Sequence, residues 1–190
     1  MEALRRIVHI VFRPREEWDR IALEDTPLPV LFRRYILPLS LLAPIATMIG
    51  MRIFDTEWSA DNGYRVPVEQ ILAAGTVTLF ASILSVFILA GIFVLIAPMY
   101  GSSRNYRDAV KVSTFGAVPV LLAGATLLLP VMAVVGIVAL VHSLFLFWLG
   151  AKQVLHVGRG EQAEFVGISM ILLSAVSTVA GAAASGLGLF

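Results

Sequence analysis

Five long apolar stretches alternate with short polar segments along the chain. A helix needs roughly 20 apolar residues to cross the ~30 Å hydrocarbon core of a bilayer. The stretches come close to this length or exceed it, and they cover residues 35–53, 70–100, 110–129, 131–150 and 165–187. The pattern predicts an all-α integral membrane bundle of five transmembrane helices, preceded by an N-terminal cytoplasmic amphipathic segment.

Prolines interrupt two of these stretches. Pro38 and Pro44 lie in the first, and Pro119 lies near the middle of the third. A proline removes one backbone hydrogen bond and kinks a helix, although neighbours in a membrane bundle can satisfy the freed carbonyl. Because only Pro130 separates the third stretch from the fourth, we expect a tight antiparallel hairpin there. A re-entrant pair is the alternative.

The basic residues test this arrangement. Of the 14 Lys and Arg residues, all but Arg52 and Arg65 precede the first span or lie in the second and fourth loops. Cytoplasmic loops carry an excess of Lys and Arg, so the N-terminus is expected in the cytoplasm and the C-terminus outside. We expect a multi-pass protein of the cell inner membrane, and no cleavable signal peptide is visible ahead of the first span.

Residues 1–34 are expected to form a separate cytoplasmic arm, with residues 35–190 as the transmembrane domain. Apolar side chains recur at helical spacing near its start, at Leu4, Ile7, Val8, Val11 and Phe12. A short basic amphipathic helix of this kind can lie in the headgroup layer. The arm is interpreted either as a partner-binding or lipid-sensing element, or as a segment that packs on the bundle and orients it.

Three groups of basic and polar side chains share the predicted cytoplasmic side. Arg5 and Arg6 belong to the arm, where Trp18 is a predicted interfacial anchor. The second loop carries a dense polar run, and the fourth loop adds Lys152. Together these residues form a candidate interaction surface for anionic headgroups or for a partner protein; its members are Arg5, Arg6, Trp18, Arg104, Arg107, Asp108, Lys111 and Lys152. Alternatively, the loop residues set topology and cap the third helix.

Chemistry within the membrane is limited to one ionisable residue. His142 is a candidate intramembrane polar site, either as a proton relay or metal ligand, or as a neutral ring bonded to a Ser, Thr or backbone carbonyl. Ser82, Ser85 and Thr114 are the side chains considered as its partners. The chain has no Cys, and no catalytic, metal-binding or phosphate-binding motif appears. We therefore expect no enzyme, no cofactor, no metal site and no nucleic-acid partner.

The last stretch is rich in small residues. Ser177, Gly181 and Ser185 recur every four positions. Small residues at this spacing let helix backbones approach closely. They are a candidate packing seam, either within the monomer or between the subunits of a homo-oligomer.

Several segments resemble one known family. "FRPREEWDRI", "YILPLSLLAPIATMIG" and "YRDAVKVSTFGAVPVLLAG" are similar to the entry, the first span and the loop-to-span stretch of the Yip1 domain family, the last through Ala109, Gly116 and Pro119. The small bacterial inner-membrane members are the most similar group. The resemblance implies five spans and a cytoplasmic N-terminus. In eukaryotes the family is associated with Golgi and endoplasmic reticulum trafficking and Rab GTPase binding, but for bacterial members it implies no established activity.

These observations favour a non-enzymatic membrane protein that acts as a scaffold, a lipid organiser or a partner-binding protein. One alternative is a small oligomeric transporter or channel, with polar residues of the spans lining a path. Another is an accessory subunit of a larger membrane complex. The expected partners are membrane lipids, with anionic headgroups as candidates, together with a protein partner or further copies of the chain.

Overall fold

The computed structural model describes residues 2–62, 66–102, 104–128 and 132–186, and this part of the chain contains helices and no strand. The elements follow in the order α1 (Glu2–Phe12), α2 (Pro14–Leu23), α3 (Leu28–Leu31), η1 (Phe32–Ile36), α4 (Leu37–Ser40), α5 (Leu42–Asn62), α6 (Val68–Ile96), η2 (Ala97–Tyr100), α7 (Tyr106–Gly116), α8 (Val118–Ala123), η3 (Gly124–Leu128), α9 (Ala133–Gln153) and α10 (Gln162–Gly186).

Within the described residues, four helical stretches are long and apolar enough to cross a membrane, namely Leu28–Ile53, Val68–Tyr100, Val134–Gln153 and Gln162–Ala183. Tyr106–Gly116 and Val118–Leu128 form a pair bent by 42° that makes a fifth span if it is counted as one. The prediction of an all-α membrane bundle is confirmed. The first span begins at Leu28, earlier than predicted, and the Pro130 hairpin lies outside the described residues.

Both irregular spans deviate where a proline lacks its N–H. Pro38 cannot donate to the carbonyl four residues earlier. The chain widens into the π-helical turn η1 directly before it, and the Leu37 N–H bonds to the Phe32 carbonyl. Pro119 has the same effect at the start of α8, directly after the bend that ends α7. The third span is therefore kinked, not straight.

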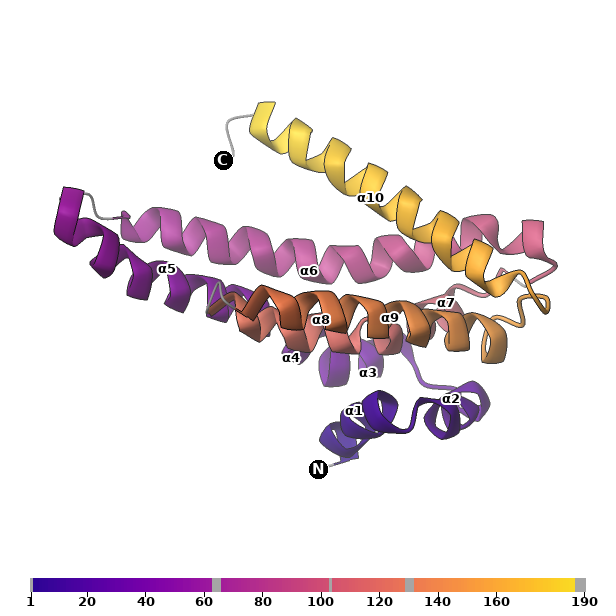
Figure 1. Cartoon of the computed structure of the whole chain (residues 1–190). Helices are drawn as coiled ribbons and strands as arrows, with labels where there is room; N and C mark the ends of the chain where they lie inside the picture. The colour runs from indigo at the N-terminus through magenta and orange to yellow at the C-terminus, as the bar shows by residue number, and fades with distance from the viewer. Residues whose placement is uncertain (1, 63–65, 103, 129–131, 187–190) are drawn as a thin grey trace.

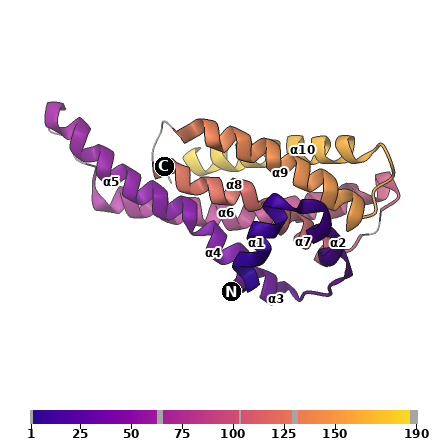
Figure 2. The ribbon, with the colours of Figure 1, turned by 60° about the horizontal axis from the view of Figure 1, so that its bottom comes forward.

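The helices α5, α6, α7–α8 and α9 run side by side, and α10 leans away from them toward its C-terminal end (Figure 1). The first two helices of the arm, α1 and α2, lie along one flank of the bundle, where α1 contacts α8 and α2 contacts α9 (Figures 1 and 2). The arm is therefore packed on the bundle and does not extend away from it.

A core of buried aromatic and aliphatic side chains lies at the end of the bundle that carries the arm. Phe93 stacks on Phe165 with ring centroids 5.3 Å apart and meets Phe147 at 6.0 Å. Gly116 permits this approach, since a Cβ atom there would lie 2.2 Å from the Phe147 ring. Toward the opposite end, α9 exposes apolar side chains such as Ile137 and Val141, as expected of a surface that faces lipid.

Candidate functional site

The first helix of the arm divides its apolar residues between two faces. Ile10 is fully buried, and Ile7 and Val11 pack against the core. The exposed stripe, defined here as Leu4, Val8 and Phe12, has exposed fractions of 69%, 49% and 78%. Spacings of four residues place this stripe on one side of the helix. The apolar face expected from the sequence is therefore divided in two. One half packs on the bundle, and the exposed stripe does not.

Trp18 attaches the arm to the bundle. Its side chain is 0% exposed and meets the Phe115 ring edge-on at 6.4 Å. Gly150 makes room for it, since a Cβ atom there would lie 2.9 Å from the indole ring. This corrects the expectation of an interfacial anchor, because the side chain contacts protein on all sides. The sequence cannot distinguish a tryptophan that faces lipid from one that packs between helices.

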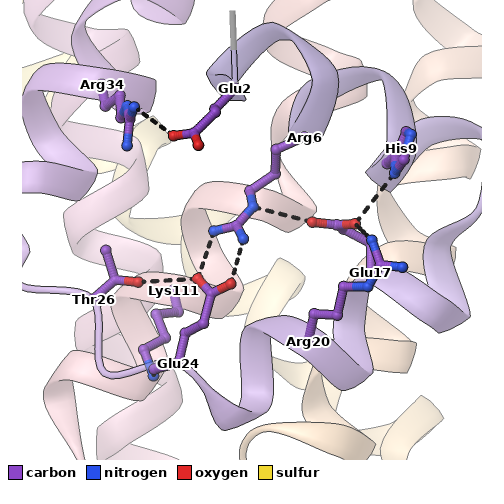
Figure 3. A network of polar contacts seen from close by, with 9 residues as sticks. All are labelled: Glu2, Arg6, His9, Glu17, Arg20, Glu24, Thr26, Arg34 and Lys111. Atoms are coloured by element: carbon purple, nitrogen blue, oxygen red, sulfur yellow. Dashed lines mark hydrogen bonds and ion pairs between the residues drawn. The ribbon is translucent and has the colours of Figure 1, made fainter.

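Arg6 points into the arm, between two carboxylates (Figure 3). Its Nε donates to Glu17 Oε1 at 3.0 Å, and its Nη1 donates to Glu24 Oε2 at 2.6 Å, while Nη2 donates to the other Glu24 oxygen. This fork favours the charged form of both partners. It lowers the pKa of Glu24 and raises the pKa of Arg6. Arg6 is thus committed within the protein and is not a free surface cation.

Glu17 is the most buried acid of the arm, with 3% of its surface exposed. Besides Arg6, it faces Arg20 Nη1 at 3.5 Å and His9 Nδ1 at 3.6 Å. A buried carboxylate is costly unless it is paired. Three cationic or titratable groups from both arm helices therefore converge on one anionic centre.

The first turns of α7, which belong to the second loop predicted from the sequence, hold the end of the arm. Lys111 is also buried, and its Nζ donates to the Glu24 carbonyl oxygen at 2.5 Å and to Asp108 Oδ1 at 3.0 Å. Arg107 Nη1 lies 2.8 Å from Asp25 Oδ1. Of the predicted surface residues, Lys111 and Arg107 therefore bind the end of the arm, and Asp108 binds Lys111. Arg5, Arg104 and Lys152 are exposed and have no ion pair in the described part of the chain.

A polar cavity of about 460 Å³ opens between α1, α2 and the start of the first span. We call it the arm cavity. Four arginines, three glutamates and His9 contribute to its lining, and the arginines are Arg5, Arg6, Arg20 and Arg34. With neutral histidine, the lining therefore carries one surplus positive charge.

His142 contacts a backbone carbonyl of the arm, one of the expected kinds of partner, and none of the three hydroxyl side chains named for it. Its Nε2 lies 3.1 Å from the Val11 carbonyl oxygen. Since that oxygen can only accept, Nε2 carries the proton and satisfies a carbonyl of the last turn of α1, which has no partner within the helix. The hydroxyls of Ser82 and Ser85 bond instead to carbonyls of their own helix. Among the described residues, no three His, Cys, Asp or Glu side chains gather closely enough to hold a metal ion.

The small-residue seam is not packed inside the monomer where it is described. Ser177 and Gly181 are exposed, and a Cβ atom at Gly181 would meet nothing within 4 Å. The side chain of Ser185 lies outside the described residues. The prediction that the seam packs within the monomer is therefore wrong for Ser177 and Gly181. Packing between subunits stays a prediction.

Glu17 and Glu24 were not recognised as site residues from the sequence. In the sequence, Glu17 is one of two acids that follow Pro14, and acids are common near a helix start. Glu24 meets Arg6 across 18 positions, and no local pattern announces a contact between separate helices. The excess of arginine in the same segment is the one signal that could have suggested buried acidic partners.

The comparisons with known proteins bear on the whole chain. The family model of the Yip1 domain matches residues 8–181. Searches of curated proteins and of solved structures found no match. The matched range extends from α1 into α10 and so includes most of the arm as well as the spans. The chain therefore belongs to the Yip1 domain family.

Proposed function

We propose that this membrane protein is non-enzymatic and organises anionic lipids around its cytoplasmic face, which is formed by the arm and the second and fourth loops. The proposal includes the orientation and the inner-membrane location expected from the charge distribution. It favours lipid over protein as the first partner of this face.

The observation that carries the proposal is a surplus of unpaired cations. Six carboxylates of this face form ion pairs, and they are Glu2, Glu16, Glu17, Glu24, Asp25 and Asp108. Six exposed cations have no ion pair among the described residues, and they are Arg5, Arg15, Arg33, Arg104, Lys152 and Arg159. Only three carboxylates, Asp19, Glu161 and Glu164, are likewise without one. Each free cation near an anionic leaflet contributes about 1 kcal/mol of attraction.

The exposed stripe supports the same proposal. Phe12, at its end, lines a shallow pocket together with Phe145 of α9. One turn before Phe145 in α9, Val141 is exposed as well. The stripe thus continues onto a lipid-facing surface of the bundle. An amphipathic helix with exposed apolar residues and flanking cations is typical of a segment that lies at the membrane interface.

The transporter alternative has less support. Hydroxyl groups in the spans were its main basis, and those of Thr76, Thr78, Ser82 and Thr178 each donate to a carbonyl of their own helix four residues earlier. Such hydroxyls are satisfied locally, so their presence needs no water-filled path to explain it.

The test is the composition of the lipid that stays with the protein. The protein is placed in a mixed membrane of phosphatidylcholine and phosphatidylglycerol, extracted with a polymer that retains surrounding lipid, and analysed by mass spectrometry. Phosphatidylglycerol is expected to be enriched over the bulk, and less so when Arg15, Arg104 and Lys152 are all replaced by Gln. Replacement of the exposed, uncharged Thr76 by Ser is the control.

Retained lipid of bulk composition would contradict the proposal. Affinity purification from native membranes then separates the remaining alternatives. A stable protein partner together with bulk-like lipid would favour a scaffold or an accessory subunit.

A further inference from the structure

We infer that the arm cavity is a binding site for a phosphate group, supplied by a phospholipid of the cytoplasmic leaflet. This inference rests on the proposed function and deepens it, since it assigns one specific site within the lipid-attracting face. The arginines of three separate elements, α1, α2 and η1, meet at this cavity.

The acids of the cavity do not neutralise these arginines equally. Glu17 and Glu24 are occupied by Arg6, and the Lys111 ammonium lies beside Glu24 as well (Figure 3). Arg5 has no ion pair in the described part of the chain. Arg20 shares the already bonded Glu17 at 3.5 Å. Glu17 and Glu24 therefore leave Arg5 fully available to bind an anion and Arg20 partly available.

Arg34 is held only by a weak competitor. Its partner Glu2 lies 3.1 Å away, and the Glu2 side chain is 85% exposed. Exposed ion pairs contribute little, because water screens them and two long side chains must be ordered. A phosphate carries more charge and accepts two parallel hydrogen bonds from a guanidinium. It can thus displace Glu2 and join Arg34 to Arg5.

A second pocket indicates why the phosphate belongs to a lipid. This shallow pocket has a volume of about 350 Å³ and is lined by Pro29, Val30, Arg33 and Arg34. It shares Val30 and Arg34 with the arm cavity, so the two are contiguous. Both adjoin the start of the first span at Leu28. A headgroup phosphate in the cavity would place the rest of the lipid beside Val30, next to the hydrocarbon layer.

The experiment is a native mass spectrometry titration of the delipidated full chain with short-chain phosphatidic acid, short-chain phosphatidylcholine and inorganic phosphate. Phosphatidic acid is expected to bind one molecule per chain, more tightly than phosphatidylcholine, which carries a compensating cation. Replacing Arg5 and Arg34 together by Gln should weaken binding by about tenfold or more, since two charge-assisted contacts are lost. Arg34→Lys should fall in between, because a lysine keeps the charge but not the fork.

The matched control replaces Arg15 and Lys152 by Gln, because both are exposed and unpaired but lie outside the lining of the cavity. Both belong to the wider lipid-attracting face, so this variant is expected to attract anionic lipid less overall but to keep the single binding site for phosphatidic acid. With Trp58 and Trp148 replaced by Phe in every protein compared, emission from the buried Trp18 reports whether the arm is still docked. If the variant with Arg5 and Arg34 replaced by Gln and the control variant bind phosphatidic acid equally tightly, the proposed site is wrong. Binding of inorganic phosphate as tight as that of the lipid would overturn the assignment to a phospholipid.

The two proposals fail in different ways. If phosphatidylglycerol enrichment persists in the Arg5 and Arg34 variant while the titration shows no specific site, the proposed phosphate site is wrong. The proposed organisation of anionic lipid then still holds. If retained lipid has bulk composition but the titration shows a cavity-dependent site, the wider function is wrong.

Discussion

Arg6 joins the two helices of the arm because a guanidinium offers a rigid fork of donors. It holds Glu24 with two hydrogen bonds and Glu17 with a third, and it lies 5.9 Å from the centre of the Phe115 ring. One side chain thereby connects α1, the end of α2 and the core. The charge of Glu24 is consequently part of what keeps the arm docked.

The lowered pKa of Glu24 predicts a loss of arm docking in acid. Docking stabilises the ionised carboxylate, so this contribution is complete above the ordinary pKa of 4.5 and disappears as the pH falls through the lowered value. In a protein with Trp58 and Trp148 replaced by Phe, Trp18 emission should shift to the red under acid. Glu24→Gln should show weaker docking at neutral pH and a smaller acid shift. An identical acid transition in both proteins would contradict this role.

Gly116 is required by the packing of α7 on α9. A methyl group there would meet Phe147 at 2.2 Å, and that ring is buried within the core. Gly116→Ala should destabilise the fold by about 1–3 kcal/mol through overpacking. Gly136→Ala is the control, because its Cβ meets nothing within 4 Å, and it should be neutral or slightly stabilising. Thermal midpoints in detergent test this, and similar midpoints would contradict it.

At the scale of elements, the arm behaves as a flanking part of the bundle. Its second helix buries Trp18 and Ile21, and its first helix buries Ile10. The bend between α7 and α8 and the π-helical turn η1 both adjoin the arm, because α1 contacts α8 and Arg34 of η1 pairs with Glu2. The bent spans and the docked arm are therefore parts of one packed unit.

His142 should stabilise the last turn of α1. His142→Ala removes the donor to the Val11 carbonyl, a loss of about 0.5–1.5 kcal/mol for a typical hydrogen bond. Amide hydrogen exchange over residues 2–12 should become faster. His142→Gln can keep an N–H donor near the same position, so it should restore part of the protection. Unchanged exchange in the alanine variant would show that this contact does not hold the arm.

At the scale of the whole molecule, charge and packing are concentrated at the same end. The aromatic core, the arm cavity and the unpaired cations lie together, whereas the first half of α9 and the second half of α10 expose apolar or small side chains. Exposed apolar side chains on a span can be covered by lipid, so this part of the bundle needs less internal packing. The molecule is therefore built to present one polar face.

The orientation of the spans can be tested with alkaline phosphatase, which is active only outside the cytoplasm. A fusion after Phe190 should be active, and a fusion at Asn105 should be inactive, because the positive-inside rule places the second loop in the cytoplasm. An inactive C-terminal fusion together with an inactive Asn105 fusion would mean an even number of spans. It would show that the bent pair α7–α8 does not cross the membrane.

The spans and their proposed orientation follow from properties of residues that are close together in the sequence. The length of an apolar run, a proline within it and the sign of the flanking charges are all local properties. For this reason the bundle could be predicted, and Pro119 correctly marked the span that bends. The arm helix also follows from its own 3.6-residue periodicity.

The candidate site depends on contacts between distant segments. Only the tertiary structure decides that Trp18 is buried and that Arg6 meets Glu24. The same holds for Lys111, which binds the end of α2, and for Gly181, which remains open. From the sequence, each of these residues could equally well lie on an exposed surface, because its burial and pairing depend on which helix packs against it. The sequence alone therefore determined a membrane bundle with a charged face, and the packing of the arm decided which of those charges are free to bind.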